Sequence, residues 1–567
     1  MAGRWRAWSY PLILLVLGAL RFVNLGFADM QAWDEGLYAV RAISILKFGG
    51  WIDQSAHAID GLYSALHPPL YIWLEALSLK IFGITEFAVR FPSALLAAGT
   101  LLIIFAIGKQ LAGRDVGFIA ALLYGINPFV DFYARQGQFD SALVFFLALA
   151  VYLIIIAEKK SSNRFAFLSG LAVGCALMTK LFVGFGIPLA YGIWWVSRSD
   201  RFSGDRVKKI VLMLVASLLV AGPWHGYMVI VHGNGNPLWL LRASEMFARV
   251  VSGIEGNQKS LEIFYFANQL LVLFPIGLSW FAYGIVRSFR NRNNGDGAIW
   301  WLPAVWFLVF FVVFSIMRTK LAFYILPMLV PASLLAGREF RRAMLGEIPK
   351  RVLALLIGIS LLASVWAASQ EWRDAIKLLL GGTPHASLHD TGRWGLIPLY
   401  ALIAASVVLA LLIYRFGLPE RLRGMLPYLF LLPLSGFGLY TIGVLDREQY
   451  DDGGRELARF VERGGYRDMV VAGFERNPQI SYYLGGIDVG WRSDIAFRRV
   501  QPPADSALVM PWLTAEAANA PAGALFVVER DRLIRHLKFS TPEILPVGYA
   551  VAFQTRRYVA FQIPSAR

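Results

Sequence analysis

The sequence predicts a polytopic α-helical membrane protein with a small α/β domain at its C-terminal end. Hydrophobic residues make up 57% of the 567 residues and charged residues only 16%, whereas soluble chains have roughly 45–50% and 25%. The mean hydropathy is +0.54, and the apolar residues gather in stretches long enough to cross a bilayer. Ordinary numbers of Pro and Gly, 26 and 52, exclude a fibrous or disordered chain.

About thirteen stretches are expected to span the membrane, because each holds a long, mostly apolar run. The first follows Arg4 and Arg6 and has no small-x-small cleavage site, so we interpret it as an uncleaved anchor. The expected spans are 9–27, 90–111, 115–133, 139–157, 165–180, 182–197, 207–228, 264–286, 299–317, 321–337, 351–369, 395–415 and 424–445.

The net charge of +16 points either to a nucleic-acid partner or to the excess of Lys and Arg in cytoplasmic loops. With a cytoplasmic N-terminus, the inner segments hold 23 basic and 8 acidic residues, a net of +15. These segments are the N-terminal tip, 109–115, 158–164, 198–209, 287–297, 338–351 and 415–423. The charge therefore reports orientation in a bacterial inner membrane, and no nucleic-acid partner is expected.

The long outer segments are then 28–89, 229–263, 370–394 and 446–567, on the periplasmic side. We divide the chain into a membrane domain, 1–445, and a periplasmic α/β domain, 446–567. The single cysteine, Cys175, excludes an intrachain disulfide and a cysteine metal site.

The first outer segment contains two amphipathic stretches, Glu35–Phe48 and Leu70–Phe82, which suit helices lying in the plane of the membrane interface. The alternative, in which Leu70–Phe82 crosses the membrane, would invert the later topology. In the C-terminal domain a helix is expected over Gly453–Gly464. Strands are expected over Met469–Phe474, Ala524–Val528 and Ala550–Gln554.

Ionisable and polar residues gather at the outer ends of the expected spans, where such groups are costly and mark function. Plainer readings exist: Asp34 and Glu35 favour a helix N-terminus, and lysines snorkel to the interface. Likewise His67 suits a turn, Arg135 an interface anchor, and Glu245 with Arg249 a helical i,i+4 pair. Because the expected topology puts all of these residues on the outer side of the membrane, we favour one common site. Its members are Asp34, Glu35, His67, Arg135, Asp140, Lys180, Trp224, His225, Glu245, Arg249, Arg318, Lys320 and Tyr324.

The cations of this group, Lys180, Arg318, Lys320, Arg249 and Arg135, would form an electropositive pocket suited to a lipid-linked phosphate or pyrophosphate. Asp34 and Asp140 would lie beside it. Either carboxylate can act as a general base toward an acceptor hydroxyl, or hold a divalent cation against the phosphate.

Three motifs resemble the first outer loop of the GT-C glycosyltransferases, especially the ArnT-like enzymes and the protein mannosyltransferases. They are Trp33-Asp34-Glu35-Gly36-Leu37-Tyr38, His67-Pro68-Pro69-Leu70-Tyr71 and Arg90-Phe91-Pro92-Ser93. The segment Lys320 to Pro327 also resembles the K-x-x-x-Y-x-L-P segment of the ArnT-like enzymes. The likeness covers about residues 1–340.

The resemblance implies a GT-C fold and an inverting transfer from a polyprenyl-phosphate sugar of the undecaprenyl-phosphate type. It makes Asp34, Asp140 and Glu35 catalytic candidates. It implies donor-phosphate binding by Lys180, Arg318, Lys320, Tyr324, Arg249, His67 and Arg135. Acceptor or sugar contacts are expected from Tyr38, Tyr71, Trp224, His225 and Glu245.

Three departures separate the chain from the ArnT pattern: Leu66 and His67 replace its Glu-Lys, and Met246 replaces a histidine. The family's zinc site is therefore not expected, and a related sugar transferase is favoured over one acting on aminoarabinose and lipid A. No cofactor is assigned, although Asp34 and Asp140 leave a divalent cation open. Expected partners are the lipid-linked sugar, membrane lipids and a glycolipid, glycan or protein acceptor.

Two other classes compete with a transferase. A transporter or flippase of lipid-linked saccharides is expected to show internal repeats and midplane polar residues, and the sequence shows neither clearly. A membrane scaffold with an outer binding domain would not need an acidic pair beside basic residues. The chain also lacks a P-loop or G-x-G-x-x-G element, which a transferase using a lipid-linked donor does not need.

Overall fold

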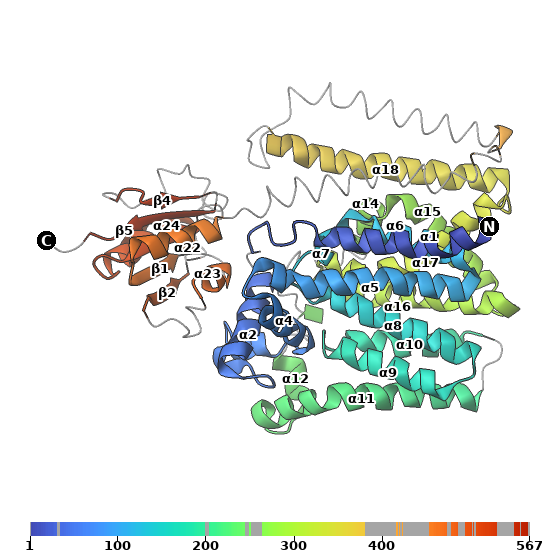
Figure 1. Ribbon diagram of the computed structural model, residues 1–567, viewed down its shortest axis with the longest axis horizontal. Helices are drawn as coiled ribbons and strands as arrows, with labels where there is room; N and C mark the ends of the chain where they lie inside the picture. Colours follow the sequence, from blue (N-terminus) through green and yellow to red (C-terminus); the bar gives the residue numbers. More distant parts are fainter. Residues whose placement is uncertain are drawn as a thin grey trace. The chain divides into compact units, whose positions relative to one another are not determined.

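The computed structural model describes most of the chain (Figure 1). The described residues are 2–30, 34–198, 203–243, 249–250, 264–379, 415–417, 419, 422, 453–472, 478–485, 494–529 without 502, 504 and 505, and 549–564 without 556. They divide into two compact units. The first unit comprises Met1–Arg21, Leu95–Ala134 and Asp140–Leu439, and the second comprises Phe22–Ala94, Arg135–Phe139 and Tyr440–Arg567.

The first unit is a bundle of helices built on the apolar stretches. Its helices are α1 (Ala2–Ala19), most of α5 (Glu86–Ala112), α6 (Arg114–Gly125), α7 (Pro128–Ala134), α8 (Asp140–Lys159), α9 (Asn163–Leu177), α10 (Gly186–Val196), α11 (Gly204–Gly233), α12 (Pro237–Ala243), α14 (Tyr265–Leu273), α15 (Pro275–Arg290), α16 (Trp301–Ile316), α17 (Leu326–Met344) and α18 (Lys350–Leu379). Short 3₁₀ turns precede α10 (Val183–Phe185), α16 (Gly295–Trp300) and α17 (Ala322–Ile325).

Among the described residues, four helical segments are long and apolar enough to cross a membrane: Glu86–Ala112, Asp140–Lys159, Gly204–Gly233 and Gly297–Ile316. A fifth candidate is the pair α6 and α7, which bends by 72° at a short break. Helices also occupy the other expected spans up to 369, several of them shorter than a full span. The count of thirteen stays a prediction, because 395–415 and 424–445 lie almost wholly outside the described residues.

Small residues allow helices α9 and α11 to pack closely. A Cβ atom added to Gly170 would lie 2.4 Å from the carbonyl oxygen of Met213, and one added to Gly174 would lie 2.9 Å from that of Ser217. Neither contact is tolerable, so glycine at both positions lets the two backbones meet. This spacing of small residues is typical of helix pairs in membranes, and α9 carries Lys180 just beyond its C-terminal end.

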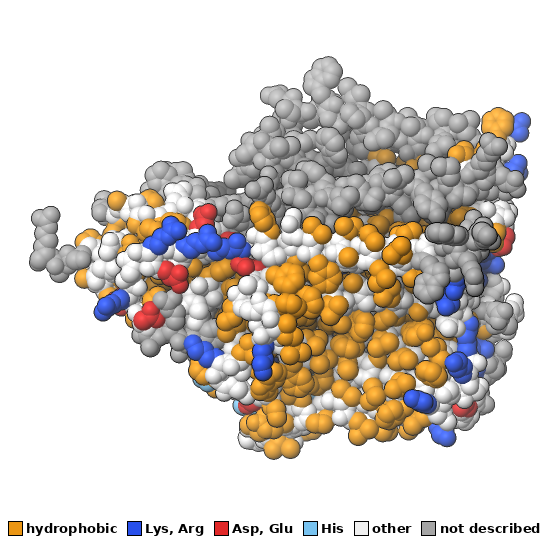
Figure 2. All heavy atoms as spheres, in the orientation of Figure 1, with side chains coloured by type: hydrophobic (Ala, Val, Ile, Leu, Met, Phe, Trp, Pro, Cys, Tyr) orange, Lys and Arg blue, Asp and Glu red, His pale blue; other side chains and the backbone are white. Residues whose placement is uncertain are grey.

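The expected cytoplasmic segments meet at one end of this bundle. Arg341 pairs with Asp115 at 2.8 Å, and Lys209 pairs with Glu158 at 2.8 Å. In Figure 2, Lys and Arg border a broad hydrophobic surface at the end of the bundle where the N-terminus lies. Such an apolar surface suits contact with lipid chains. The structure thus groups the basic segments as expected, while the direction in which they face a membrane stays a prediction.

The second unit combines the first long outer segment with the C-terminal domain. The segment forms α2 (Asp34–Phe48), α3 (Leu62–Ala65), α4 (Leu70–Phe82) and the beginning of α5. Both amphipathic helices predicted from the sequence are present. Helix α4 has 13 residues, about 20 Å at 1.5 Å per residue, which is short of the roughly 30 Å of a bilayer core. Its length therefore favours the interface over the spanning alternative.

The C-terminal domain is a three-layer α/β fold. Strands β1 (Asp468–Ala472), β2 (Ala496–Val500), β3 (Leu525–Glu529), β4 (Phe553–Gln554) and β5 (Tyr558–Gln562) form one sheet in the order β2-β1-β3-β5-β4. The pairs β1–β2 and β1–β3 are parallel, and β5 is antiparallel to both of its neighbours. The predicted α/β class is present, with β4 shorter than its expected strand.

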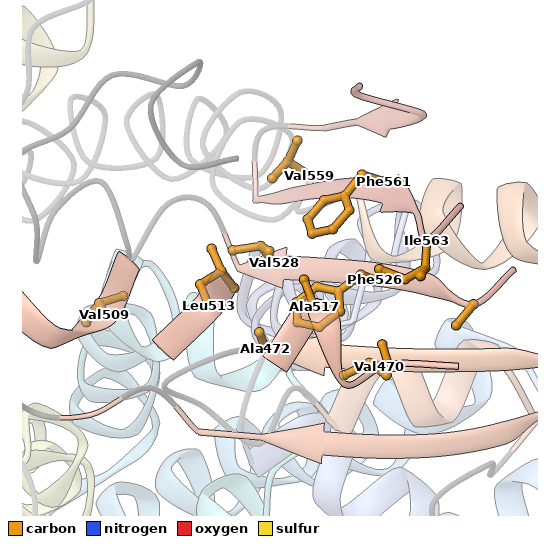
Figure 3. Close-up of a cluster of buried hydrophobic side chains, with 12 residues drawn as sticks. Val470, Ala472, Val509, Leu513, Ala517, Phe526, Val528, Val559, Phe561 and Ile563 are labelled. Atoms are coloured by element: carbon orange, nitrogen blue, oxygen red, sulfur yellow. The ribbon is translucent and has the colours of Figure 1, made fainter. Parts of the chain in front are cut away.

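The sheet is buried on both of its faces. Its central strands carry apolar side chains at successive positions, and these point alternately to the two faces. One face, with Val470, Phe526 and Phe561, packs against α24 (Ser506–Ala518), as Figure 3 shows. The other face packs against α22 (Gly454–Gly464) and α23 (Pro478–Tyr483). The predicted helix over Gly453–Gly464 is therefore confirmed, and it contributes its apolar side to this core.

Candidate functional site

The acidic pair begins helix α2. Asp34 is half-buried at the first helical position, and Glu35 is completely buried behind it. Carboxylates in a first helical turn interact favourably with the N-terminal end of the helix dipole. Glu35 forms a bidentate ion pair with Arg90, with Nε to Oε1 at 2.7 Å and Nη2 to Oε2 at 3.0 Å. The two neighbours therefore have different surroundings: Glu35 is held inside the fold, and Asp34 is partly accessible.

Arg90 also fixes the segment that leads to the acidic pair. Its Nη1 donates to the carbonyl oxygens of Leu25 at 3.0 Å and Ala28 at 2.9 Å, and its Nη2 donates to that of Asp29 at 2.7 Å. A planar guanidinium with several fixed donors suits such a junction. The sequence motif Arg90-Phe91-Pro92-Ser93 contains this residue, but the sequence prediction did not include it among the site residues.

Residues 135–139 join the second unit through backbone and side-chain contacts. The Gly137 N–H donates to Glu35 Oε1 at 2.7 Å. A Cβ atom on Gly137 would lie 2.5 Å from Val89 Cγ1, so this approach needs glycine. The buried side chain of Arg135 donates from Nη1 to the Val23 carbonyl oxygen at 2.9 Å. That contact gives Arg135 a part in holding the backbone, and its predicted phosphate contact stays a prediction.

Aromatic side chains surround the other predicted residues of the first outer segment. Tyr38 contacts the rings of His67, Tyr71 and Phe139, with centroid distances of 6.2, 6.4 and 5.2 Å. The Tyr71 hydroxyl shares a 2.8 Å hydrogen bond with Ser93 Oγ. The sequence prediction named the first three residues and missed Phe139, which is apolar and therefore carried no signal of chemistry.

Arg41 links this aromatic group to the residues between helices α2 and α4. Its guanidinium donates to Gln54 Oε1 at 2.7 Å and to the carbonyl oxygens of Ser64 at 2.8 Å and His67 at 3.0 Å. Burial lowers the pKa of Arg41 to about 10, so the side chain stays charged at neutral pH. The buried cation anchors the turn in which His67 precedes the prolines.

The first unit holds a separate group centred on Lys180. The Lys180 Nζ lies 3.4 Å from Asp140 Oδ1, and their side chains are 20% and 5% exposed. The same ammonium lies over the rings of Tyr324 at 4.6 Å and Phe323 at 5.0 Å. A cation held between a buried carboxylate and two aromatic faces has a fixed position, and the Lys180 side chain still keeps part of its surface exposed. The predicted residues Asp140, Lys180 and Tyr324 are thus brought together.

Lys320 is placed differently from Lys180. Its buried ammonium donates to the carbonyl oxygens of Ser315 at 2.7 Å and of Met317, at the C-terminal end of α16. A cation at this end compensates the unsatisfied carbonyls and the helix dipole. Its predicted contact with a donor phosphate would require that it release these carbonyls.

The remaining predicted residues of this unit lie on three segments. Arg318 is exposed, and the backbone N–H groups of Arg318 and Thr319 donate to the carbonyl oxygens of Val250 and Arg249 at 3.3 and 3.0 Å. The segment containing Arg249 is thereby held beside the one containing Arg318. The third segment is helix α11, which carries Trp224 and His225, and Glu245 lies outside the described residues.

Trp224 is buried in α11, and its ring meets that of His225 edge to face at 5.0 Å. The ring Nδ1 of His225 lies 2.7 Å from the Ala221 carbonyl oxygen. The His225 ring therefore contacts its own helix, and the role of both residues toward an acceptor or sugar stays a prediction.

A metal ion was left open for Asp34 and Asp140. Across the described ranges, no three side chains of His, Cys, Asp or Glu are grouped so as to hold a metal ion. Asp140 is instead paired with Lys180. A role of Asp34 and Asp140 toward a divalent cation stays a prediction.

Comparison with known proteins gives matches in sequence and in fold. Residues 66–227 match the family of dolichyl-phosphate-mannose-protein mannosyltransferases. An undecaprenyl phosphate-alpha-4-amino-4-deoxy-L-arabinose arabinosyl transferase of Pseudomonas fluorescens is 28% identical over 340 residues, 59% of each chain. A protein of the same name from Pseudomonas aeruginosa is 27% identical over 383 residues, 66% of this chain and 67% of the relative. The chain thus spans about three fifths of the first of these relatives.

The fold is similar to the crystal structure of ArnT from Cupriavidus metallidurans bound to undecaprenyl phosphate. The TM-score is 0.65 at 17% sequence identity, with 100% of both chains covered. The chain therefore shares the fold of ArnT. In sequence, the chain is similar to the undecaprenyl-phosphate arabinosyl transferases and, over residues 66–227, to the dolichyl-phosphate-mannose-protein mannosyltransferases.

Proposed function

We propose that the chain is an inverting glycosyltransferase that moves a sugar from a polyprenyl-phosphate donor of the undecaprenyl-phosphate type to a lipid, glycan or protein acceptor. The observation that carries the proposal is the Lys180 ammonium, partly exposed and held by Asp140 over Tyr324 and Phe323. Its support from comparison is a fold similar to that of ArnT bound to undecaprenyl phosphate.

In the proposed reaction, the acceptor hydroxyl attacks the anomeric carbon from the side opposite the phosphate. A bond forms between the acceptor oxygen and this carbon, while the bond from the carbon to the phosphate oxygen breaks. The polyprenyl phosphate leaves with the bonding electrons, and Asp34 accepts the hydroxyl proton. Lys180 stabilises the negative charge that grows on the departing phosphate.

The different surroundings of the acidic pair support this division of roles. Glu35 is occupied by Arg90 and by the Gly137 N–H, so its carboxylate is committed to the fold. Asp34 is half-buried, which leaves it accessible to a substrate. We therefore assign the proton transfer to Asp34 and the placement of Asp34 to Glu35.

The aromatic group of Tyr38, His67, Tyr71 and Phe139 is proposed to contact the sugar or the acceptor. Tyrosine supplies both an apolar ring face and a hydroxyl, and aromatic residues are common in ligand sites. The relatives' names specify 4-amino-4-deoxy-L-arabinose. The departures at Leu66, His67 and Met246 make a different sugar the favoured donor for this chain.

The proposed setting is the bacterial inner membrane, with about thirteen spans, a cytoplasmic N-terminus and a periplasmic C-terminal domain. The grouping of basic segments at one end of the bundle supports this orientation. Donor, acceptor and the residues assigned here would then all be on the periplasmic face.

The test uses the full chain in lipid nanodiscs with undecaprenyl-phosphate sugars labelled in the sugar, a pentose, an amino-pentose and a hexose. Asp34→Asn should lower kcat by about 10² to 10⁴, the range supplied by general acid–base catalysis. Asp60→Asn is the matched control, because Asp60 is exposed in the same outer segment. Transfer at the parental rate by Asp34→Asn would remove Asp34 from the proposed role.

Lys180 is tested separately through the donor. Lys180→Ala should lower kcat/KM for the donor about 100-fold, the usual effect of losing one stabilising donor, and Lys180→Arg should retain part of it. The exposed Lys160 provides the control variant Lys160→Ala. Unchanged donor dependence in Lys180→Ala would contradict the phosphate assignment. A flippase would instead move the labelled lipid across a vesicle membrane without cleaving the sugar from its carrier.

A further inference from the structure

The segment Ala28–Met30 precedes Asp34 closely in the sequence and is held from two sides within the second unit. On one side, Arg90 donates to the carbonyl oxygens of Ala28 and Asp29. This contact belongs to the outer segment itself. The contacts on the other side come from the C-terminal domain, more than 400 residues later in the chain.

Arg455, in the first turn of α22, provides the first of these distant contacts. Its backbone N–H donates to Asp29 Oδ2 at 3.3 Å, and its guanidinium lies 3.2 Å from Asp29 Oδ1. The guanidinium also donates to Glu86 Oε1, with distances of 2.6 Å from Nη2 and 3.1 Å from Nε. Asp29 and Glu86 are 6% and 15% exposed, so the charges that Arg455 joins are largely removed from solvent.

Helix α23 provides the second contact. The Met30 N–H donates to the Tyr483 hydroxyl oxygen at 2.8 Å, and Met30 is completely buried. Close by in the sequence, a Cβ atom on Gly36 would lie 2.8 Å from the backbone nitrogen of Gln479. Helix α2 therefore packs on α23 at a distance that only glycine allows. Met30 and Gly36, which lie on either side of Asp34 in the sequence, are both in contact with the C-terminal domain.

We propose that Arg455 and Tyr483 are positioning residues, through which the C-terminal domain sets the placement of Asp34. The inference rests on the proposed function, in which Asp34 is the base. A general base must lie within hydrogen-bond reach of the proton that it accepts, and an error of about 1 Å is enough to lower a rate 100-fold. Neither residue is assigned a contact with a substrate.

The experiment measures donor kinetics and amide hydrogen exchange on the full chain. Arg455→Ala and Tyr483→Phe should lower kcat about 10- to 100-fold and change the donor KM by less than about twofold, because phosphate binding is assigned elsewhere. Amide exchange over residues 28–48 should become faster, while exchange over β3 should stay slow. Arg455→Lys should restore part of kcat, since lysine keeps the charge without the planar pair of donors.

Arg459→Ala is the matched control, because Arg459 is exposed on the same helix. Parental kcat in both Arg455→Ala and Tyr483→Phe would overturn the inference, and so would an equal loss in Arg459→Ala. Faster exchange throughout the C-terminal domain would also count against it, because the effect would then be general unfolding. If Asp34→Asn is inactive while Arg455→Ala keeps its kcat, this inference fails alone; if Asp34→Asn is fully active, the proposed base fails as well.

Discussion

Replacing Glu35 by Gln tests whether this carboxylate has a structural or a chemical role. The parental carboxylate accepts three hydrogen bonds, two from Arg90 and one from the Gly137 N–H. Glutamine keeps the Oε1 acceptor but places an amide NH₂ opposite Arg90 Nη2, so that two donors face each other. It also leaves the charge of the buried Arg90 uncompensated.

The expected cost follows from this geometry. Removing one partner of a buried ion pair costs about 3–5 kcal/mol. Arg90 keeps its three hydrogen bonds to backbone carbonyl oxygens, so we expect the lower end, about 3 kcal/mol. At about 1.4 kcal/mol per factor of ten, local opening of this region should become about 150-fold more populated.

Amide hydrogen exchange at Gly137 and along α2 measures this opening. Under conditions where closing is faster than exchange, the rates should rise by the same 150-fold relative to the parent chain. Glu456→Gln is the control, because Glu456 is exposed on α22. Parental exchange rates in Glu35→Gln, together with abolished transfer, would refute the structural role and make Glu35 a chemical residue.

Three further predictions concern single residues of the second unit. Gly36→Ala should destabilise the unit by about 1–3 kcal/mol, because its Cβ would meet the Gln479 backbone at 2.8 Å; an unchanged thermal midpoint in detergent would contradict this. Tyr71→Phe should cost about 1 kcal/mol by removing the hydroxyl partner of Ser93, measured in the same way. Burial raises the pKa of Glu75 well above its ordinary value of 4.5, so the folded state binds the proton more tightly and stability should fall as pH rises above about 5; Glu75→Gln should flatten this dependence, and an equal slope in both proteins would count against it.

Much of the helical architecture could be predicted because apolar length is a local property. The stretch Leu70–Phe82 is observed as α4 with the predicted bounds, and Glu35–Phe48 is observed as α2 with Asp34 added. The C-terminal sheet was less predictable. The prediction omitted β2, whose sequence Ala496–Val500 contains two arginines on a partly exposed edge, and it omitted β5, which is only five residues long.

The candidate site was predictable at the level of residue type. An acidic pair after the first expected span and a lysine at a tight turn between two expected spans are unusual, because charged residues are costly near the membrane core. This signal selected Asp34, Glu35 and Lys180. The different roles of the two acids were not predictable. Glu35 is distinguished from Asp34 by its pairing with Arg90, 55 residues away in the chain, and no local pattern encodes that pairing.

The sequence by itself predicted a helical chain of membrane type, the positions of its apolar helices and the grouping of charge, because these depend on composition and short-range periodicity. The tertiary structure alone decided which side chains are committed to other groups. It placed Lys180 against Asp140 and two rings, turned Lys320 toward the end of α16, and attached Arg455 to Asp29. The physical reason is that an ion pair or hydrogen bond depends on distance and burial in space, and folding sets both between residues that are far apart in sequence.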